Sequence, residues 1–302
     1  MFLNFDEEVF QACKTSHYEN LDFIREIMLE LKMIPESPLC PSCAFPTSLN
    51  KDNSRPFLAR YWCGRCVKRY CARNFSAFTF SRLKSREILQ ILALFVSEQS
   101  VTEIIAKTEL SSHTVQSVIS FIRKSIFCYI ERIRQPIGNN SIVEIDETLI
   151  AKKRKYNRGR IVTQQWLFGA IERDGGRLFL KTVESRDKRT LGQLIKNFIV
   201  DSSTVYSDQW ASYISFFAEE GGYNHSSVNH SKNFVNPEDS SVHTQTIEGI
   251  WGKLKEWLRR KHLNNREYLE EYLAEFIWRR ENKALSKSAL MKELVSILNC
   301  NE

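Results

Sequence analysis

The sequence of 302 residues contains no apolar run long enough to cross a membrane and no low-complexity tract. Its opening stretch, MFLNFDEEVFQACK, has acidic side chains where a secretory signal has positive charge. We therefore expect a globular protein of the cytosol or nucleus. Because thiols stay reduced in those compartments, the eight cysteines are better interpreted as metal ligands or free thiols than as a disulfide framework.

The chain is basic, with 43 Lys and Arg against 36 Asp and Glu and a net charge of +7. Its basic residues are clustered, which favours a phosphate backbone or an anionic surface as a partner. Mild basicity that serves only solubility is the alternative. The length is sufficient for two or three domains, and 42% of the residues are hydrophobic, enough to form sizeable cores.

Four cysteines have the spacing of a zinc site. Cys40 and Cys43 form one C-x2-C pair, and Cys63 and Cys66 form another. The separation of the pairs is in the range of paired zinc knuckles, whose four thiolates surround Zn2+ as a tetrahedron. The β-prone residues FLARYWC before the second pair indicate a zinc ribbon. Four ligands close the coordination shell, so the expected role of the zinc is structural. Chance clustering of free cysteines is the alternative.

Two short helices are predicted after the ribbon. Ser100 and Glu103 form a capping box at the start of the first helix, and the helical pattern breaks near Glu109. Two helices joined by a short turn are typical of a helix-turn-helix, whose second helix enters the major groove of DNA. The residues expected to contact DNA are Ser112, His113 and Gln116. A helix pair that serves only as a core is the alternative.

From residue 141 the pattern changes from helix to strand. IVEIDETLI, WLFGAIE and RLFLKTVE are predicted strands, DKRTLGQLIKNFI is a predicted helix, and STVYSDQW is a fourth strand. This order is expected of an α/β domain with a mixed sheet of the ribonuclease-H-like type. The first and fourth strands can be neighbours in such a sheet, which would bring Asp146 and Asp208 together.

A third carboxylate is needed, because two Mg2+ ions require several hard oxygen ligands. The candidate is Glu248 in HTQTIEGIWGKLKEWLRRK, in the first turn of an amphipathic helix, where the helix dipole favours a carboxylate. Thr244 or Thr246 would cap this helix. Lys255 and Arg259, farther along the same helix, are expected to contact DNA.

Three neighbouring groups are weaker candidates. Strand alternation places Glu144 on the same face as Asp146 and Glu147 on the other face, so Glu147 is the less favoured metal ligand. His243 could contact a phosphate or relay a proton, although a lone histidine near a helix start is more often a cap or a surface residue. The alternative to a catalytic triad is three unrelated acids at strand and helix ends.

The motifs VEIDET, VYSDQWASY and VHTQTIEGIWGKLKEWLRR, with YWCGRCVKRY upstream, resemble the DDE transposases of the Merlin superfamily and the related bacterial insertion-sequence transposases with an N-terminal zinc ribbon. The resemblance covers residues 34–283. It implies binding of terminal inverted repeats and target DNA, with two Mg2+ or Mn2+ ions held by Asp146, Asp208 and Glu248. It also implies a homodimer or a larger assembly, because two DNA ends must be brought together.

A basic run follows the first predicted strand of this domain. Its members are Lys152, Lys153, Arg154, Lys155, Arg158 and Arg160. We expect them to contact DNA phosphates near the cut site, while a nuclear-localisation segment and a merely solvated loop are the alternatives. A nuclear location is expected from this run and from the Merlin resemblance.

The sequence therefore predicts five regions: a helical segment at 1–35, a zinc ribbon at 36–76, a helix-turn-helix region at 77–136, a ribonuclease-H-like catalytic domain at 141–284 and a helical tail at 285–302. Two other functions stay open on the sequence. One is a domesticated, non-catalytic DNA-binding protein, and the other is a metal-dependent nuclease that performs no strand transfer.

Overall fold

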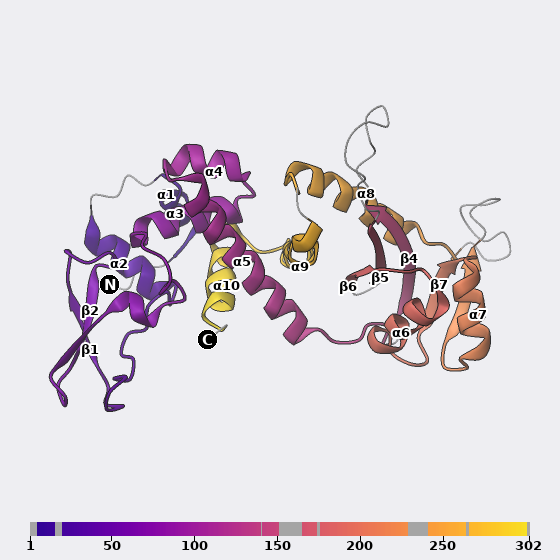
Figure 1. Cartoon of the computed structure of the whole chain (residues 1–302), viewed down its shortest axis with the longest axis horizontal. Helices are drawn as coiled ribbons and strands as arrows, with labels where there is room; N and C mark the ends of the chain where they lie inside the picture. The colour runs from indigo at the N-terminus through magenta and orange to yellow at the C-terminus, as the bar shows by residue number, and fades with distance from the viewer. Residues whose placement is uncertain are drawn as a thin grey trace. The chain divides into compact units, whose positions relative to one another are not determined.

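The computed structural model describes residues 5–15, 20–139, 141–150, 165–173, 176–228, 241–263 and 266–300. The chain divides into two compact units: one comprises Met1–Arg132 and Asn282–Glu302, and the other comprises Ile133–Glu281 (Figure 1). The chain therefore leaves the first unit, builds the second and returns. Among the described residues, no helix is both long and apolar enough to cross a membrane.

The first unit is built around a buried helix. Its helices are α1 (Glu7–Cys13), α2 (Leu21–Glu30), η1 (Ala72–Phe75), α3 (Ser85–Val96), α4 (Val101–Thr108), α5 (Ser112–Ile133), which ends at the border of the unit, and α10 (Lys287–Asn299). Ten of the twelve residues of α3 are buried, and α1, α2, α4 and α10 pack around it. Helix α10 thus completes the core of a unit whose other elements come from the first half of the chain.

The predicted capping box and helix break are both present. Ser100 Oγ accepts a hydrogen bond from the Glu103 N–H at 3.2 Å, and the Glu103 carboxylate accepts one from the Ser100 N–H at 2.7 Å. Glu109 ends α4 in the left-handed conformation with φ 56°. Helix α5 then begins at Ser112, so a three-residue turn joins the two helices.

A small antiparallel sheet carries the cysteine motifs. Its strands are β1 (Ser48–Lys51), β2 (Ala59–Cys63) and β3 (Lys68–Cys71), in the order β1-β2-β3. Burial alternates along β2, with Tyr61 and Cys63 fully buried and Trp62 between them half-buried. This alternation is the strand pattern expected of a sheet with one covered face.

The second unit contains a five-stranded mixed sheet. In chain order its elements are β4 (Ile142–Ile150), β5 (Gln165–Glu172), β6 (Leu178–Val183), α6 (Lys188–Phe198), β7 (Thr204–Asp208), α7 (Ala211–Glu219), β8 (Asn224–Val228), α8 (Gln245–Arg260), η3 (Arg266–Tyr268) and α9 (Leu269–Glu281). The strand order is β6-β5-β4-β7-β8, with β6-β5-β4 antiparallel and β4-β7-β8 parallel. This is the ribonuclease-H-like arrangement, so the predicted fold class is confirmed.

Helices cover both faces of this sheet. On one face, Val143, Ile145 and Val205 join an apolar core to which α6 and α7 contribute Leu191, Ile195, Tyr213 and Phe216. On the other face, α8 packs on β4 and β5, and α9 packs on β6 (Figure 1). Even-numbered residues of β4 therefore face α8, and odd-numbered residues face α6 and α7.

Candidate active site

Asp146 and Asp208 lie side by side on the α8 face of the sheet. Strands β4 and β7 pair in parallel, with Ile142 opposite Thr204 and Glu144 opposite Tyr206. Two residues farther along each strand, the same register places Asp146 next to Asp208. The sheet thus brings together two acids that are far apart in the sequence, as the strand order predicted.

The carboxyl of Asp146 is held by a tryptophan. Trp251 of α8 donates an indole N–H hydrogen bond to Asp146 Oδ2 at 2.8 Å. Burial raises the pKa of Asp146 to about 7; the Trp251 hydrogen bond opposes this shift, and the charges of Glu147 and Asp208 add to it. A carboxyl with this raised pKa beside a second carboxyl is a candidate cation site, since a bound cation would favour both charged forms.

A glycine makes room for this tryptophan. Gly169 of β5 is paired with Asp146, and a Cβ atom at Gly169 would lie 2.4 Å from Trp251 Cη2. The sequence prediction missed both residues. The available signal was a lone glycine within an apolar strand, which marks the close approach of another group to the backbone.

Glu248 lies in the first turn of α8, one turn before Trp251, and its side chain is exposed. Its Oε1 accepts a hydrogen bond from Thr244 Oγ1 at 3.2 Å. Within the described parts of the chain, the ligand atoms of Asp146, Asp208 and Glu248 do not form a group within 4.8 Å of one another. The structure therefore brings the two aspartates together and places Glu248 on the helix that covers them. The Glu248 carboxylate does not complete a group of three with the aspartates.

Thr244 occupies the N-cap position of α8, as predicted, but its side chain makes no capping hydrogen bond. Glu144 of β4 takes this role, because its Oε2 accepts hydrogen bonds from the Thr246 N–H at 2.8 Å and the Ile247 N–H at 3.0 Å. Thr246 Oγ1 adds a bond to Glu144 Oε1 at 2.8 Å. Glu144 does share the face of Asp146, as alternation predicted, but its oxygens are committed to the helix start.

Arg173 joins the same network. Its Nε donates to Glu144 Oε1 at 2.6 Å, and its other nitrogens donate to the carbonyls of Ser241 and His243, both at 2.7 Å. The Arg173 nitrogen that donates to the His243 carbonyl also lies 2.9 Å from His243 Nδ1. His243 is therefore part of the link that fixes the start of α8 to the sheet, beside the strand that carries Asp146.

Glu147 belongs to a separate network on the opposite face. Arg186 donates two hydrogen bonds to Glu147 Oε2, at 2.9 and 3.0 Å, and the Tyr213 hydroxyl donates to Oε1. Burial raises the pKa of Glu147, although these bonds oppose the shift. The Arg186 guanidinium lies between the rings of Trp166 and Trp210, 4.3 and 4.1 Å from their centres.

This second network reaches the site through Trp210. The Trp210 N–H donates to Asp208 Oδ1 at 2.9 Å, and its indole N–H donates to the Arg186 carbonyl at 3.1 Å. Glu147 is thus a structural group that helps to hold the turn after Asp208. The sequence contains no local signal that relates Arg186 or Trp210 to this turn.

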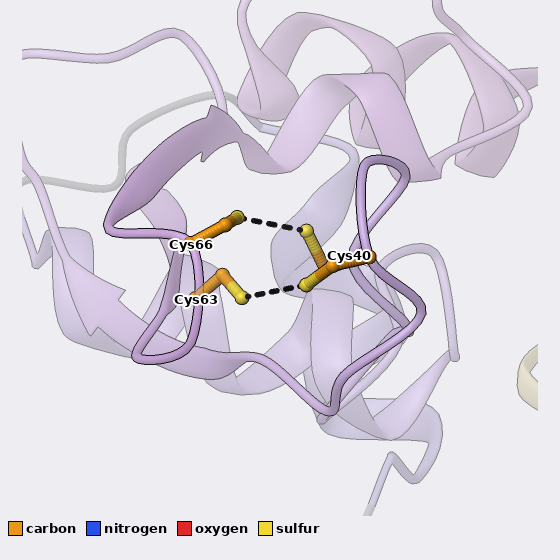
Figure 2. Close-up of side chains that lie close together, drawn as sticks. Cys40, Cys63 and Cys66 are labelled. Atoms are coloured by element: carbon orange, nitrogen blue, oxygen red, sulfur yellow. Dashed lines mark hydrogen bonds between the residues drawn. The ribbon is translucent and has the colours of Figure 1, made fainter.

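The four predicted zinc ligands form one cluster. The sulfur atoms of Cys40, Cys43, Cys63 and Cys66 all lie within 4.8 Å of one another, and no disulfide joins them. The Cys40–Cys66 and Cys43–Cys63 sulfur pairs are each 3.5 Å apart, across the two facing knuckles (Figure 2). A tetrahedron of Zn–S bonds about 2.3 Å long has edges of about 3.8 Å, so the cluster fits zinc.

The predicted DNA contacts are accessible where the structure describes them. Ser112, His113 and Gln116 are exposed at the start of α5, and Lys255 and Arg259 are exposed on α8. The predicted basic loop, with Lys152, Lys153, Arg154, Lys155, Arg158 and Arg160, lies outside the described residues.

Solved structures of DNA-processing proteins are similar to the chain at low scores. The Mos1 transposase paired-end complex matches 69% of this chain and 74% of that chain, with 12% identity and a TM-score of 0.32. The HTLV-2 integrase catalytic core matches 47% and 88%, with 13% identity and a TM-score of 0.29. A chain of the simian T-cell lymphotropic virus intasome matches 62% of this chain and 64% of that chain, with 12% identity and a TM-score of 0.31. The fold assignment therefore rests on the strand order.

The family comparison covers the unit that contains the site. No curated protein matches the chain. Residues 139–281 match the family described as the ISXO2-like transposase domain, and this range contains Asp146, Asp208 and Glu248. The resemblance to insertion-sequence transposases is thus confirmed. Residues 139–281 of this chain are therefore similar to the ISXO2-like transposase domain.

Proposed function

We propose that the protein is a DNA transposase that binds terminal inverted repeats, cuts DNA at them and joins the cut ends to target DNA. The observation that carries the proposal is the parallel register of β4 and β7, which puts Asp146 beside Asp208 on the face covered by α8. The family match makes transposase chemistry the reaction that these acids would serve.

The proposed ligands of the catalytic cations are Asp146, Asp208 and Glu248. Divalent ions such as Mg2+ or Mn2+ would supply activation of a water or of a 3′ hydroxyl and stabilisation of the leaving oxygen. The chain's own part is positioning. Trp251 fixes one oxygen of Asp146, Trp210 fixes one oxygen of Asp208, and Glu144 anchors the helix that carries Glu248.

The proposed DNA contacts come from both units. Ser112, His113 and Gln116 would read the terminal repeat from the start of α5, in the manner of a recognition helix. Lys255 and Arg259 would hold phosphates along α8, together with the basic run at 152–160. The reaction requires two DNA ends, so a homodimer or a larger assembly is part of the proposal, and the nucleus stays the predicted location.

The test is cleavage and strand transfer on short duplexes that carry the inverted repeats flanking the gene, with Mg2+ or Mn2+. Joined products should form with the wild type and be lost with Asp146→Asn and with Asp208→Asn. Asp201→Asn, which changes an exposed acid of the same unit, is the matched control. Equal joining by the wild type and Asp208→Asn would contradict the proposal.

Two partial results would identify the other functions. Tight binding of the repeat without cutting would indicate a domesticated DNA-binding protein. Metal-dependent hydrolysis without joining would indicate a nuclease.

A further inference from the structure

Trp210, two residues after Asp208, is a large aromatic side chain at the surface. It occupies the N-cap position of α7, and its exposed fraction is 39%. Single exposed aromatic residues are common on protein surfaces. This one differs because it lies next to an aspartate that is proposed to bind the catalytic cation, and because its ring is held in place.

Two contacts with Arg186 hold the indole. The indole N–H donates to the Arg186 carbonyl at 3.1 Å, and the Arg186 guanidinium lies 4.1 Å from the Trp210 ring centre. The guanidinium is fixed in turn by Glu147 and by the ring of Trp166, whose centre is 4.3 Å away. The Trp210 ring is therefore positioned before any ligand arrives, so binding to it costs little side-chain entropy.

The apolar surface around Trp210 is too small for a protein interface. Ile214, one turn farther along α7, adds a second exposed apolar side chain, at 44%. The other exposed residues of α7 are small or charged: Ala211, Ser215, Ala218 and Glu219. A stable protein–protein interface buries about 800 Å² on each partner, which two side chains do not supply. The exposed ring instead suits a single planar group.

A nucleobase is the planar group that DNA offers. Bases of any sequence stack on aromatic side chains through their π faces. The Trp210 backbone N–H donates to Asp208 Oδ1 at 2.9 Å, so the ring belongs to a residue in direct contact with the proposed cation ligand. A phosphate held by a cation at Asp208 would bring its own nucleotides close to this ring. Inside a duplex the base faces are covered, so the stacked base must be terminal or unpaired, as cutting allows at a DNA end.

We infer that Trp210 stacks on an unpaired nucleobase beside the scissile phosphate and so holds the cut DNA end at the site. The inference rests on the proposed function, because it takes cut DNA as the ligand. It deepens that function by assigning a residue that binds the DNA end without coordinating the cation. Because stacking uses the face of a base and not its edge, the contact should depend little on which base is present.

The test is equilibrium binding of the full-length, zinc-loaded protein to labelled inverted-repeat duplexes nicked at the cut site. The 3′ end at the nick lacks its hydroxyl, so Mn2+ can be present without strand joining. One duplex has all its bases, and in the others an abasic nucleotide replaces each base next to the nick in turn. Trp210→Leu removes the ring, and Trp210→Tyr keeps an aromatic face. Trp166→Leu is the matched control, because it removes the ring on the other side of the same guanidinium.

We expect Trp210→Leu to weaken binding to the duplex with all its bases by roughly five- to hundredfold, and Trp210→Tyr to weaken it less. This loss should disappear on the duplex that lacks the stacked base, whereas Trp166→Leu should change binding by the same factor on every duplex. An equal loss for Trp210→Leu on all duplexes, or no loss on any, would overturn the inference. Joining by the wild type is measured separately, so joining without this coupling and coupling without joining are distinguishable results.

Discussion

At the scale of single residues, the raised pKa of Asp146 lowers the stability of the metal-free folded protein at neutral pH. Its pKa is about 7 in the folded protein against an ordinary value of 3.8. Between these values the folded state binds a proton that the unfolded chain does not, so the stability of the metal-free protein falls as pH rises from about 4 to above 7. Asp146→Asn removes this penalty.

We therefore expect the stability advantage of metal-free Asp146→Asn over the wild type to be larger at pH 8 than at pH 5, by about 1–3 kcal/mol. Thermal unfolding at the two pH values measures this, as a difference in Tm that grows by several degrees from pH 5 to pH 8. The same difference in Tm at both pH values would contradict the raised pKa.

Glu144 is a second residue whose loss should destabilise the fold. It is fully buried and accepts hydrogen bonds from Arg173, Thr246 and Ile247. Glu144→Ala should lower the free energy of unfolding by roughly 3–5 kcal/mol, since it leaves the Arg173 guanidinium without its carboxylate partner. Denaturant unfolding measures this loss. Glu248→Ala, an exposed acid near the same helix start, is the control and should cost about 1 kcal/mol or less.

The double variant Glu144→Ala/Arg173→Met separates the two parts of this effect. It should recover part of the loss of Glu144→Ala, because no unpaired charge is left behind. Strict additivity of the two single variants would show that Arg173 and Glu144 do not act together.

At the scale of secondary-structure elements, the contact between α8 and the sheet depends on glycine. Gly169→Ala places a methyl group 2.4 Å from Trp251 and should cost about 1–3 kcal/mol through overpacking, with loss of the Trp251 bond to Asp146. Gly252→Ala in α8 meets nothing within 4 Å and should instead stabilise the protein by about 0.5–1 kcal/mol. Unfolding of the two variants gives the signs, and equal signs would contradict the packing described.

We expect the ribbon to depend on metal. Its three strands have 4, 5 and 4 residues, too little to fold without the cysteine cluster. Chelation of zinc, or Cys66→Ser, should expose the 36–76 region to proteolysis while the sheet of the second unit stays protected. Cys71→Ser, a cysteine outside the cluster, is the control and should keep one zinc per chain.

At the scale of the whole molecule, local and regular features were predictable. The cysteine spacing and the Ser100 capping box depend on neighbours in the sequence. Strand order predicts that β4 and β7 are neighbours, whereas the register that aligns Asp146 with Asp208 comes from the structure. The side chain that accepts the first N–H bonds of α8 could not be predicted, because Glu144 lies 102 residues before Thr246. Strand β8, NHSSV, was missed because it has polar residues and is a strand through its pairing with β7.

The sequence also did not predict that the C-terminal segment, Asn282–Glu302, belongs to the first unit. Helix α10 packs on α1 and α3, and Lys292 forms an ion pair with Glu30 at 3.1 Å. The pattern of α10 predicts an amphipathic helix but contains no information on which distant helix it covers. Long-range partners of this kind are set by the complementary shape of the packed surfaces.

We propose that Asp146 and Asp208 together bind a divalent cation. Calorimetric titration of Mn2+ into the zinc-loaded protein at pH 8 tests it most directly, with Asp146→Asn, Asp208→Asn and the control Asp201→Asn. We predict that the wild type and Asp201→Asn bind Mn2+ with equal affinity and that each site variant loses binding by tenfold or more. Unchanged Mn2+ affinity in both site variants would contradict the claim.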